Sequence, residues 1–98
     1  MTYLIQQTDT FSHWLRALRD TKAKVAIVRR LGRAHAGNLG DLKPVGDNVS
    51  EMRVDVGPGY RLYFTRRGEM LILLLCGGDK SSQSRDITLA KKLAGEIG

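Results

Sequence analysis

The sequence predicts an α+β fold, in which helices pack on a small, mainly antiparallel sheet in the order βααβββα. Two stretches in the first half repeat apolar residues at the i, i+3, i+4, i+7 spacing of a helix with one buried face. Two later stretches alternate apolar and polar residues like half-buried strands, and an unbroken apolar run follows them. Because a chain of 98 residues rarely divides into two cores, we expect a single domain spanning residues 1–98.

The first half of the chain is expected to form a short strand and two helices. Residues 3–7 favour the strand. Asp9 or Thr10 can cap a first helix, whose apolar face is formed by Phe11, Trp14, Leu15 and Leu18. A second helix begins near Asp20 or Thr21 and ends near residue 35, because glycines at positions 37 and 40 stop it. Its apolar stripe consists of Ala23, Ile27, Leu31 and Ala34.

The second half is expected to form three strands and a final helix. Residues 37–48 are rich in Gly, Asp and Asn and contain Pro44, which predicts an ordered loop. Strands follow over residues 49–56 and 60–66, joined by a Gly-Pro-Gly turn. The apolar run over residues 70–76 predicts a central strand covered on both faces, which Gly77 and Gly78 are expected to break. The last helix is expected over about residues 82–96, and its apolar face towards the core consists of Ile87, Ala90, Leu93 and Ala94.

The turn at residues 57–59 predicts the register of the hairpin around it. A three-residue connection pairs Val56 with Tyr60, and the apolar residues of the two strands then face one another. The same register places three polar pairs opposite each other: Asp55 with Arg61, Arg53 with Tyr63, and Glu51 with Thr65. The polar face of the hairpin therefore gathers two arginines, two acids and a tyrosine.

Such a face has groups that could cut RNA without a metal. In that reaction a 2′-hydroxyl attacks the neighbouring phosphate, so it needs a base, a cation that stabilises the phosphate, and an acid for the departing oxygen. The planar fork of Arg61 suits a phosphate. Glu51 or Asp55 could act as the base, and Tyr63 could stack on a nucleobase or donate a proton. The alternative is an ordinary cross-strand salt bridge between Asp55 and Arg61.

The charge of the chain favours a polyanionic partner. Sixteen lysines and arginines face ten acids, which gives a net charge of +6. An acidic protein partner, or no such partner, remains an alternative. On the second helix Lys22, Arg29 and Arg33 lie together, away from the apolar stripe, and form a basic ridge that either binds nucleic acid or is a solvated face.

Composition also excludes several classes of protein. No apolar run is long enough to span a membrane, and the N-terminus lacks the pattern of a secretory signal. The single cysteine, Cys76, lies in the apolar run, and we expect it to be a small buried residue. His13 and His35 fall on separate helices without a Cys/His cluster, so we expect no metal site and no cofactor. A cytoplasmic location fits these observations.

Several segments resemble the Gp49-like, HigB-related toxins of the RelE/ParE superfamily, the "addiction module killer" proteins. The resemblance covers nearly the whole chain and is carried by residues 14–20, 29–31, 37–46, 50–53, 57–64 and 74–80. It implies a RelE-like fold and the toxin of a type II toxin–antitoxin system. It further implies a ribosome-dependent endoribonuclease, an mRNA interferase that inhibits translation, and a hetero-oligomeric complex with an antitoxin encoded by the adjacent gene.

The resemblance also assigns roles to residues. The arginine of the family's Gly-Tyr-Arg motif matches Arg61, an earlier strand residue matches Arg53, and the basic residue after the last strand matches Lys80. These three would be catalytic. Some members carry a tyrosine or a histidine–aspartate group near the C-terminus, where this chain has Asp86 as a fallback acid or base. Further contacts to RNA or the ribosome are expected from Lys22, Arg29, Arg33, Lys43 and Arg85.

Two other functions fit the same scaffold. A ParE-like protein would inhibit DNA gyrase without cutting RNA, and the weak match near the C-terminus favours this alternative. A reduced toxin-like protein would bind only RNA or its antitoxin. The set of Arg53, Arg61 and Lys80 favours the ribonuclease, but fold alone does not decide between these functions.

Overall fold

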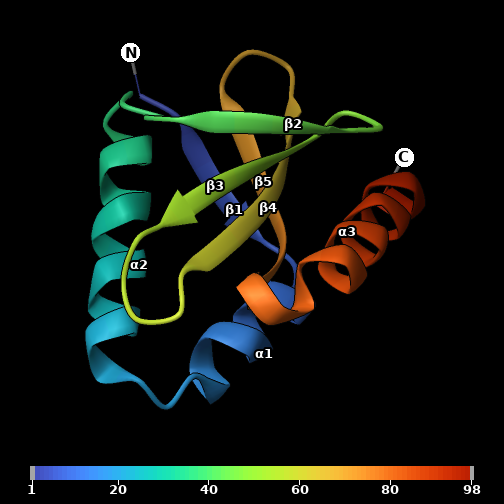
Figure 1. Cartoon of the computed structure of the whole chain (residues 1–98). Coiled ribbons are helices and arrows are strands. Elements are labelled where there is room, and N and C mark those ends of the chain that lie inside the picture. Colours follow the sequence, from blue (N-terminus) through green and yellow to red (C-terminus); the bar gives the residue numbers. More distant parts are fainter. Residues whose placement is uncertain (1, 98) are drawn as a thin grey trace.

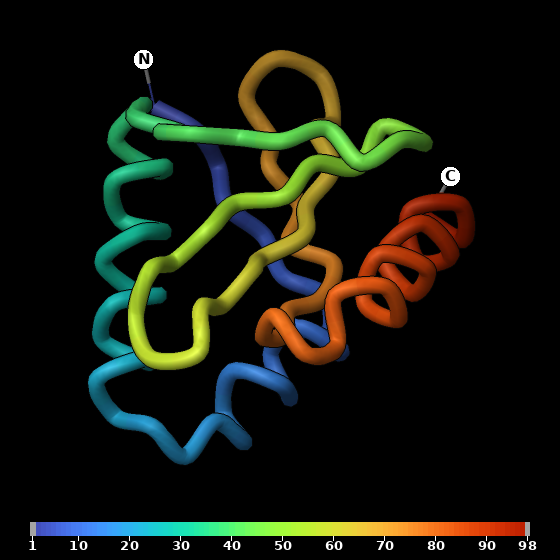
Figure 2. Tube along the Cα trace, viewed as in Figure 1, coloured from blue at the N-terminus to red at the C-terminus, as the bar shows by residue number. Residues whose placement is uncertain are grey.

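A five-stranded sheet with helices on both faces forms the protein (Figure 1). The computed structural model describes residues 2–97. The strand order is β1-β5-β4-β3-β2, in which β1 runs parallel to β5 and all other neighbours are antiparallel. The tube in Figure 2 follows the chain from the first strand, through two helices, into the four remaining strands and the last helix. The predicted α+β architecture is confirmed, with one additional strand.

The elements have the following bounds: β1 (Leu4–Gln7), α1 (Asp9–Ala17), α2 (Thr21–His35), β2 (Leu42–Gly46), β3 (Val49–Val54), β4 (Tyr60–Arg67), β5 (Leu71–Asp79), the short 3-10 helix η1 (Lys80–Ser82) and α3 (Gln83–Ile97). The cap of α1 is Thr8, whose side chain accepts a hydrogen bond from Phe11 N at 3.1 Å, and not the predicted Asp9 or Thr10. Asp20 caps α2 in the same way, and the helix begins where the sequence predicts, near Asp20 or Thr21.

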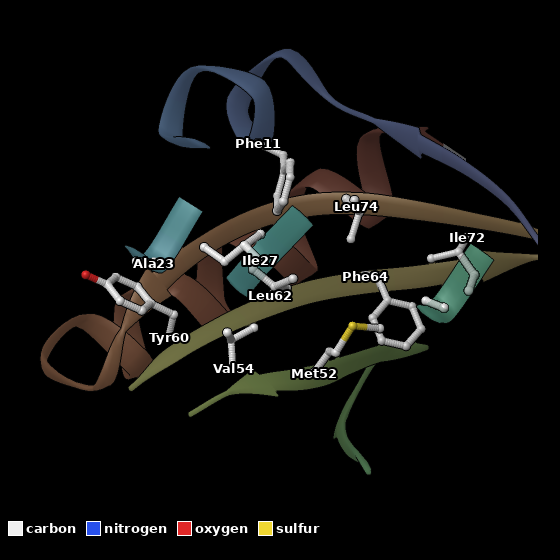
Figure 3. Close-up of a cluster of buried hydrophobic side chains, with 11 residues drawn as sticks. Phe11, Ala23, Ile27, Met52, Val54, Tyr60, Leu62, Phe64, Ile72 and Leu74 are labelled. Carbon is white, nitrogen blue, oxygen red and sulfur yellow. The ribbon is translucent and has the colours of Figure 1, made fainter. Parts of the chain in front are cut away.

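Two apolar cores lie on opposite faces of the sheet. The larger core packs α1 and α2 on one face, and Figure 3 shows side chains from β3, β4 and β5 meeting those of the two helices. The smaller core, under α3, contains Val49, Tyr63, Leu73, Leu75, Cys76 and Ala90. Burial raises the pKa of the Cys76 thiol to about 12, in agreement with its reading as a buried residue. No helix within residues 2–97 is long and apolar enough to cross a membrane.

The loop predicted over residues 37–48 contains a strand, and this prediction is wrong in part. Strand β2 pairs with β3 through residues such as Leu42 with Met52 and Lys43 with Glu51. Pro44 and Gly46 are tolerated because β2 lies at the edge of the sheet, where missing hydrogen bonds and an irregular register do little harm. The composition of the segment therefore concealed an edge strand.

The β3–β4 hairpin has a register shifted by two residues from the predicted one. Val54 pairs with Tyr60, Arg53 with Arg61 and Glu51 with Tyr63, so residues 55–59 connect the strands. Glycines at positions 57 and 59 adopt φ values of +55° and +83°, which allow the chain to reverse within this longer, five-residue connection. A shift of two residues keeps each side chain on its predicted face. The predicted opposite pairs Asp55–Arg61, Arg53–Tyr63 and Glu51–Thr65 are nevertheless wrong.

Strand β5 continues through Gly77 and Gly78 to Asp79, so the predicted break is also wrong. Both glycines are required by close packing. A Cβ atom at Gly77 would overlap the ring of Trp14 on α1, and one at Gly78 would overlap the carboxylate of Asp86 on α3. The glycine pair therefore lets helices approach the strand from both faces.

Gly77→Ala is expected to lower the free energy of unfolding by about 1–3 kcal/mol, because the added methyl group must displace Trp14. Urea denaturation followed by tryptophan fluorescence measures the change. Gly95→Ala on α3 is the matched control: its Cβ meets open space, and alanine favours a helix by about 0.5–1 kcal/mol. Equal urea midpoints for Gly77→Ala and the wild type would show that Trp14 moves aside without cost.

Candidate functional site

Three basic side chains from separate segments line one open depression at the end of the β3–β4 hairpin. Its volume is about 390 Å³, and its walls include Arg53, Arg61 and Lys80 together with residues 55–59 of the turn and Tyr60. Lys80 follows β5 directly, and its backbone N–H donates to Gly59 O at 3.1 Å, which ties it to the turn. The three residues predicted to be catalytic thus share one surface.

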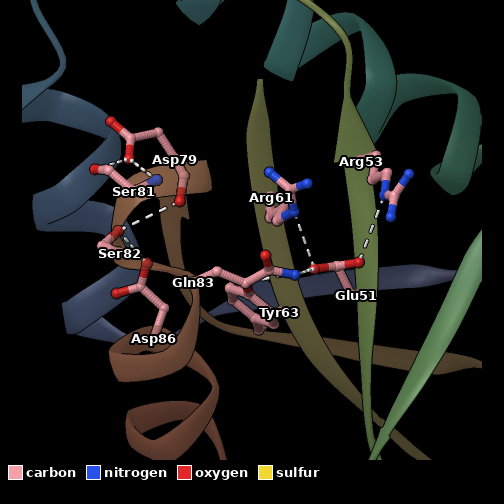
Figure 4. Close-up of polar contacts among 9 residues, drawn as sticks. All are labelled: Glu51, Arg53, Arg61, Tyr63, Asp79, Ser81, Ser82, Gln83 and Asp86. Atoms are coloured by element: carbon pink, nitrogen blue, oxygen red, sulfur yellow. Dashed lines mark hydrogen bonds and ion pairs between the residues drawn. The ribbon is translucent and has the colours of Figure 1, made fainter. Parts of the chain in front are cut away.

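Glu51 lies beneath the two arginines of this depression. Its side chain is fully buried, and its Oε1 atom is 3.2 Å from Nε of Arg61 while Oε2 is 3.6 Å from Nε of Arg53. The exposed fractions of these side chains are 10% for Arg61 and 54% for Arg53. Figure 4 shows Glu51 reaching from β3 towards β4, with Gln83 arriving from the first turn of α3. Gln83 Nε2 donates to Glu51 Oε1 at 2.9 Å.

Tyr63 is fully buried beside Glu51, so it cannot stack on a nucleobase as predicted. Its hydroxyl donates to Glu51 Oε1 over a long distance of 3.5 Å. Burial, reinforced by Glu51 and Asp86, raises the pKa of Tyr63. The hydroxyl therefore stays protonated at neutral pH. Glu51 itself has no exposed surface through which a substrate hydroxyl could reach it.

The remaining acids predicted for the site lie in different surroundings. Asp55 is exposed in the β3–β4 connection, and it forms no ion pair with Arg61 among the described residues. Asp86 accepts a hydrogen bond from Ser82 Oγ at 2.5 Å and packs against Gly78, and it is not among the residues that line the depression. Asp79 caps η1, and hydrogen bonds from Ser81 hold its pKa below the usual range. Asp55 is therefore the exposed acid at the depression.

A broader groove of about 1120 Å³ lies between α2 and the β2–β3 strands, beside the depression. Its cationic lining residues come from α2, β2 and β3: Arg29, Arg30, Arg33, Lys43 and Arg53. Arg53 and Asp55 line both hollows, which makes them neighbours on one surface. Two members of the predicted basic ridge, Arg29 and Arg33, thus belong to this groove. Lys22 is exposed on α2 outside its lining, and Arg85 is exposed on α3 away from both hollows.

Arg30 holds one wall of the groove in place. It is only 6% exposed, and it donates from Nε to Arg53 O at 3.3 Å and from Nη2 to Leu39 O at 2.6 Å. A Cβ atom at Gly40 would come within 2.7 Å of Arg30 Nη2, so the glycine leaves space for the guanidinium. Arg30 therefore ties the loop after α2 to the strand that carries Arg53.

Comparison with known proteins identifies a close relative. No family model matches the sequence. A protein of Haemophilus influenzae strain Rd, described only as an uncharacterized protein, is 48% identical over 98 residues, which is 100% of this chain and 99% of the relative. The chain belongs to the family of this Haemophilus protein. Identity at this level over the full length of both chains means that the two proteins share one fold.

That fold is also found in a solved toxin structure. A mutant of the Escherichia coli toxin RelE in the free state superposes with a TM-score of 0.72, over 99% of this chain and 98% of RelE. The sequences are 12% identical, so the likeness is one of fold. The RelE-like fold predicted from the sequence is thereby confirmed for this chain.

Sequence reasoning missed two residues that organise the site in this member of the Haemophilus family. Arg30 follows Ile27 by three positions and precedes Ala34 by four, so it falls on the buried face of α2. The sequence-based prediction of that face included only apolar residues. Its position on that stripe was the available signal. Gln83 had no such signal, because its contact with Glu51 joins residues 32 positions apart.

Proposed function

We propose that this chain is the toxin of a type II toxin–antitoxin pair, of the HigB-related kind, and that it cleaves messenger RNA on the ribosome. The observation that carries the proposal is the convergence of Arg53, Arg61 and Lys80 on one depression. A cationic groove continues from that depression along α2. The fold shared with the E. coli toxin RelE supports the same conclusion.

The proposed chemistry is attack of a 2′-hydroxyl on the adjacent phosphate. Arg61, with Arg53 beside it, would bind the phosphate through guanidinium N–H groups and stabilise the charge that grows in the transition state. Asp55 and Lys80 are the exposed acid and the exposed lysine at the depression. Asp55 would take the proton of the 2′-hydroxyl, and Lys80 would give a proton to the 5′-oxygen as its bond to phosphorus breaks, which leaves a 2′,3′-cyclic phosphate. The groove with Arg29, Arg33 and Lys43 would hold neighbouring phosphates of the RNA or of the ribosome.

Cleavage is expected to require the ribosome. The depression is open and offers no buried base, so it gains most when another body holds the RNA in an attack-ready geometry. Purified protein should therefore cut mRNA bound to ribosomes far faster than naked mRNA in the same buffer. Efficient cleavage of naked mRNA would contradict this part of the proposal.

Brief expression followed by mapping of RNA ends tests the function as a whole. The expected result is growth arrest with new mRNA ends inside reading frames. Intact mRNA with trapped gyrase–DNA breaks would instead identify a gyrase inhibitor on the same scaffold. Normal growth despite abundant soluble protein would contradict both. Co-expression of a small protein from the adjacent gene should restore growth, because an antitoxin must cover or distort the basic surface.

Removing the charge of the basic ridge is expected to weaken docking without slowing chemistry. Alanine at Lys22, Arg29 and Arg33 should lower affinity for ribosomes and flatten its salt dependence, since fewer counterions are released. The cleavage rate at saturating protein should stay nearly unchanged. The charge-matched control places alanine at exposed residues outside the groove: Arg16, Arg19 and Lys92. Equal affinity of both triple variants would identify the ridge as a solvated face.

A further inference from the structure

We propose that Glu51 is a positioning residue, whose buried carboxylate holds Arg53 and Arg61 side by side so that both can bind one phosphate. The inference rests on the proposed function. It departs from the sequence-based reading of Glu51 as a general base, because a buried carboxylate bound on several sides has no path to a substrate hydroxyl. No covalent step passes through Glu51.

The strand register creates a conflict that Glu51 resolves. Arg53 and Arg61 are directly opposite each other across β3 and β4, where side chains are typically about 4.5–5.5 Å apart at Cβ and like charges repel. Glu51 precedes Arg53 by two residues and shares its face of β3. Its negative charge lies against both guanidinium groups and offsets their repulsion.

The manner of contact leaves the arginines available to a ligand. Glu51 contacts each arginine at Nε, which is the guanidinium nitrogen closest to the backbone. Its Oε1 atom lies at Arg61 and its Oε2 atom at Arg53. Within residues 2–97 the Nη atoms of these two side chains make no hydrogen bond to the protein. Both arginines line the depression, so their terminal N–H groups can turn to an anion there.

Glu51 is itself held from the side of α3. Gln83 Nε2 donates to Oε1 at 2.9 Å, and Gln83 is the first residue of α3. The Tyr63 hydroxyl makes a longer contact of 3.5 Å to the same oxygen, and burial keeps that hydroxyl protonated by raising its pKa. The packing of α3 on the sheet is thus transmitted through Gln83 and Glu51 to the two arginines.

Glu51→Gln tests the proposal, because glutamine keeps the shape of the side chain and removes its charge. On ribosomes carrying labelled mRNA, the single-turnover rate at saturating protein should fall about tenfold to a hundredfold, the cost of slightly misplaced groups. The half-saturating concentration and the shape of the pH–rate profile should not change. Glu69→Gln, at an exposed acid outside the site, should behave like the wild type. An unchanged cleavage rate in Glu51→Gln would overturn the proposal. Loss of one limb of the pH–rate profile would also overturn it, because that loss would identify Glu51 as the base.

A second readout does not depend on cleavage. In the folded wild type the Nε proton of Arg61 should exchange slowly with water in NMR spectra, because the Nε atom is buried and the ion pair with Glu51, at 3.2 Å, holds it there. Exchange should accelerate in Glu51→Gln and, to a lesser degree, in Gln83→Ala, which leaves both charges in place. If the wild type cleaves no mRNA, the proposed function fails while this measurement still decides the role of Glu51. Gln83→Ala also decides the question if Glu51→Gln does not fold. Unchanged exchange of the Arg61 Nε proton in Gln83→Ala, together with an unchanged cleavage rate, would overturn the proposal.

Discussion

Arg61→Ala is expected to fold and to bind ribosomes but to cleave bound mRNA about 10²–10³ times more slowly, the usual cost of losing a group that stabilises transition-state charge. Folding should survive because Glu51 keeps three partners, Arg53, Gln83 and Tyr63, after the guanidinium is gone. Arg61→Lys should recover only part of the rate, since an ammonium group cannot reproduce two parallel hydrogen bonds. Single-turnover cleavage at saturating protein measures both variants.

The control for this prediction removes the same charge elsewhere. Arg19 is exposed between α1 and α2 and lines neither hollow, so Arg19→Ala should cleave at the wild-type rate. Thermal denaturation verifies that each variant is folded. A folded Arg61→Ala protein that cuts mRNA as fast as the wild type would remove Arg61 from the catalytic site and reduce its pairing with Glu51 to a structural contact.

Arg30→Met is expected to lower the free energy of unfolding by about 2–4 kcal/mol, because two carbonyl groups lose their donor. For a domain of this size the melting temperature should fall by at least about 8 °C. Burial, aided by the positive charge of Arg33, lowers the pKa of Arg30. The lowered pKa means that placing this cation inside the protein costs free energy. The hydrogen bonds to Arg53 O and Leu39 O must outweigh that cost.

Arg29→Met provides the comparison for Arg30. The residues are adjacent on α2, but Arg29 is exposed, so its replacement should change stability by no more than about 0.5 kcal/mol. Differential scanning calorimetry of both variants distinguishes the two positions. If Arg30→Met melted at or above the wild-type temperature, the cost of burying the charge would exceed the value of its hydrogen bonds.

Much of the fold was predictable because its signals are local. Helical spacing located α1, α2 and α3, and strict alternation assigned both faces of β3 and β4. The features that failed depend on tertiary structure. Pro44 and Gly46 indicate a loop unless the segment is known to lie at a sheet edge. Gly77 and Gly78 indicate a break unless the approach of two helices is known.

The site shows the same division between local and non-local information. The family motif pointed to Arg53, Arg61 and Lys80, and the structure brings these residues to one depression. The partner of Arg61 was predicted to be Asp55, but the length of the turn, which sequence did not reveal, makes it Glu51. The side-chain faces followed from a period of two, whereas the register required the backbone conformation of residues 55–59.

The parallel pairing of β1 with β5 has a consequence for the order of events during synthesis. Leu4 pairs with Leu71, and the Thr8 hydroxyl donates to a carbonyl 67 positions later, so the first strand has no partner strand until most of the chain exists. Contacts so distant in sequence form slowly, because a long loop must close before they yield any stabilisation. Lys80 and Gln83 come later still. A nascent chain therefore cannot assemble the arginine depression until its last strand and the residues directly after that strand have been made.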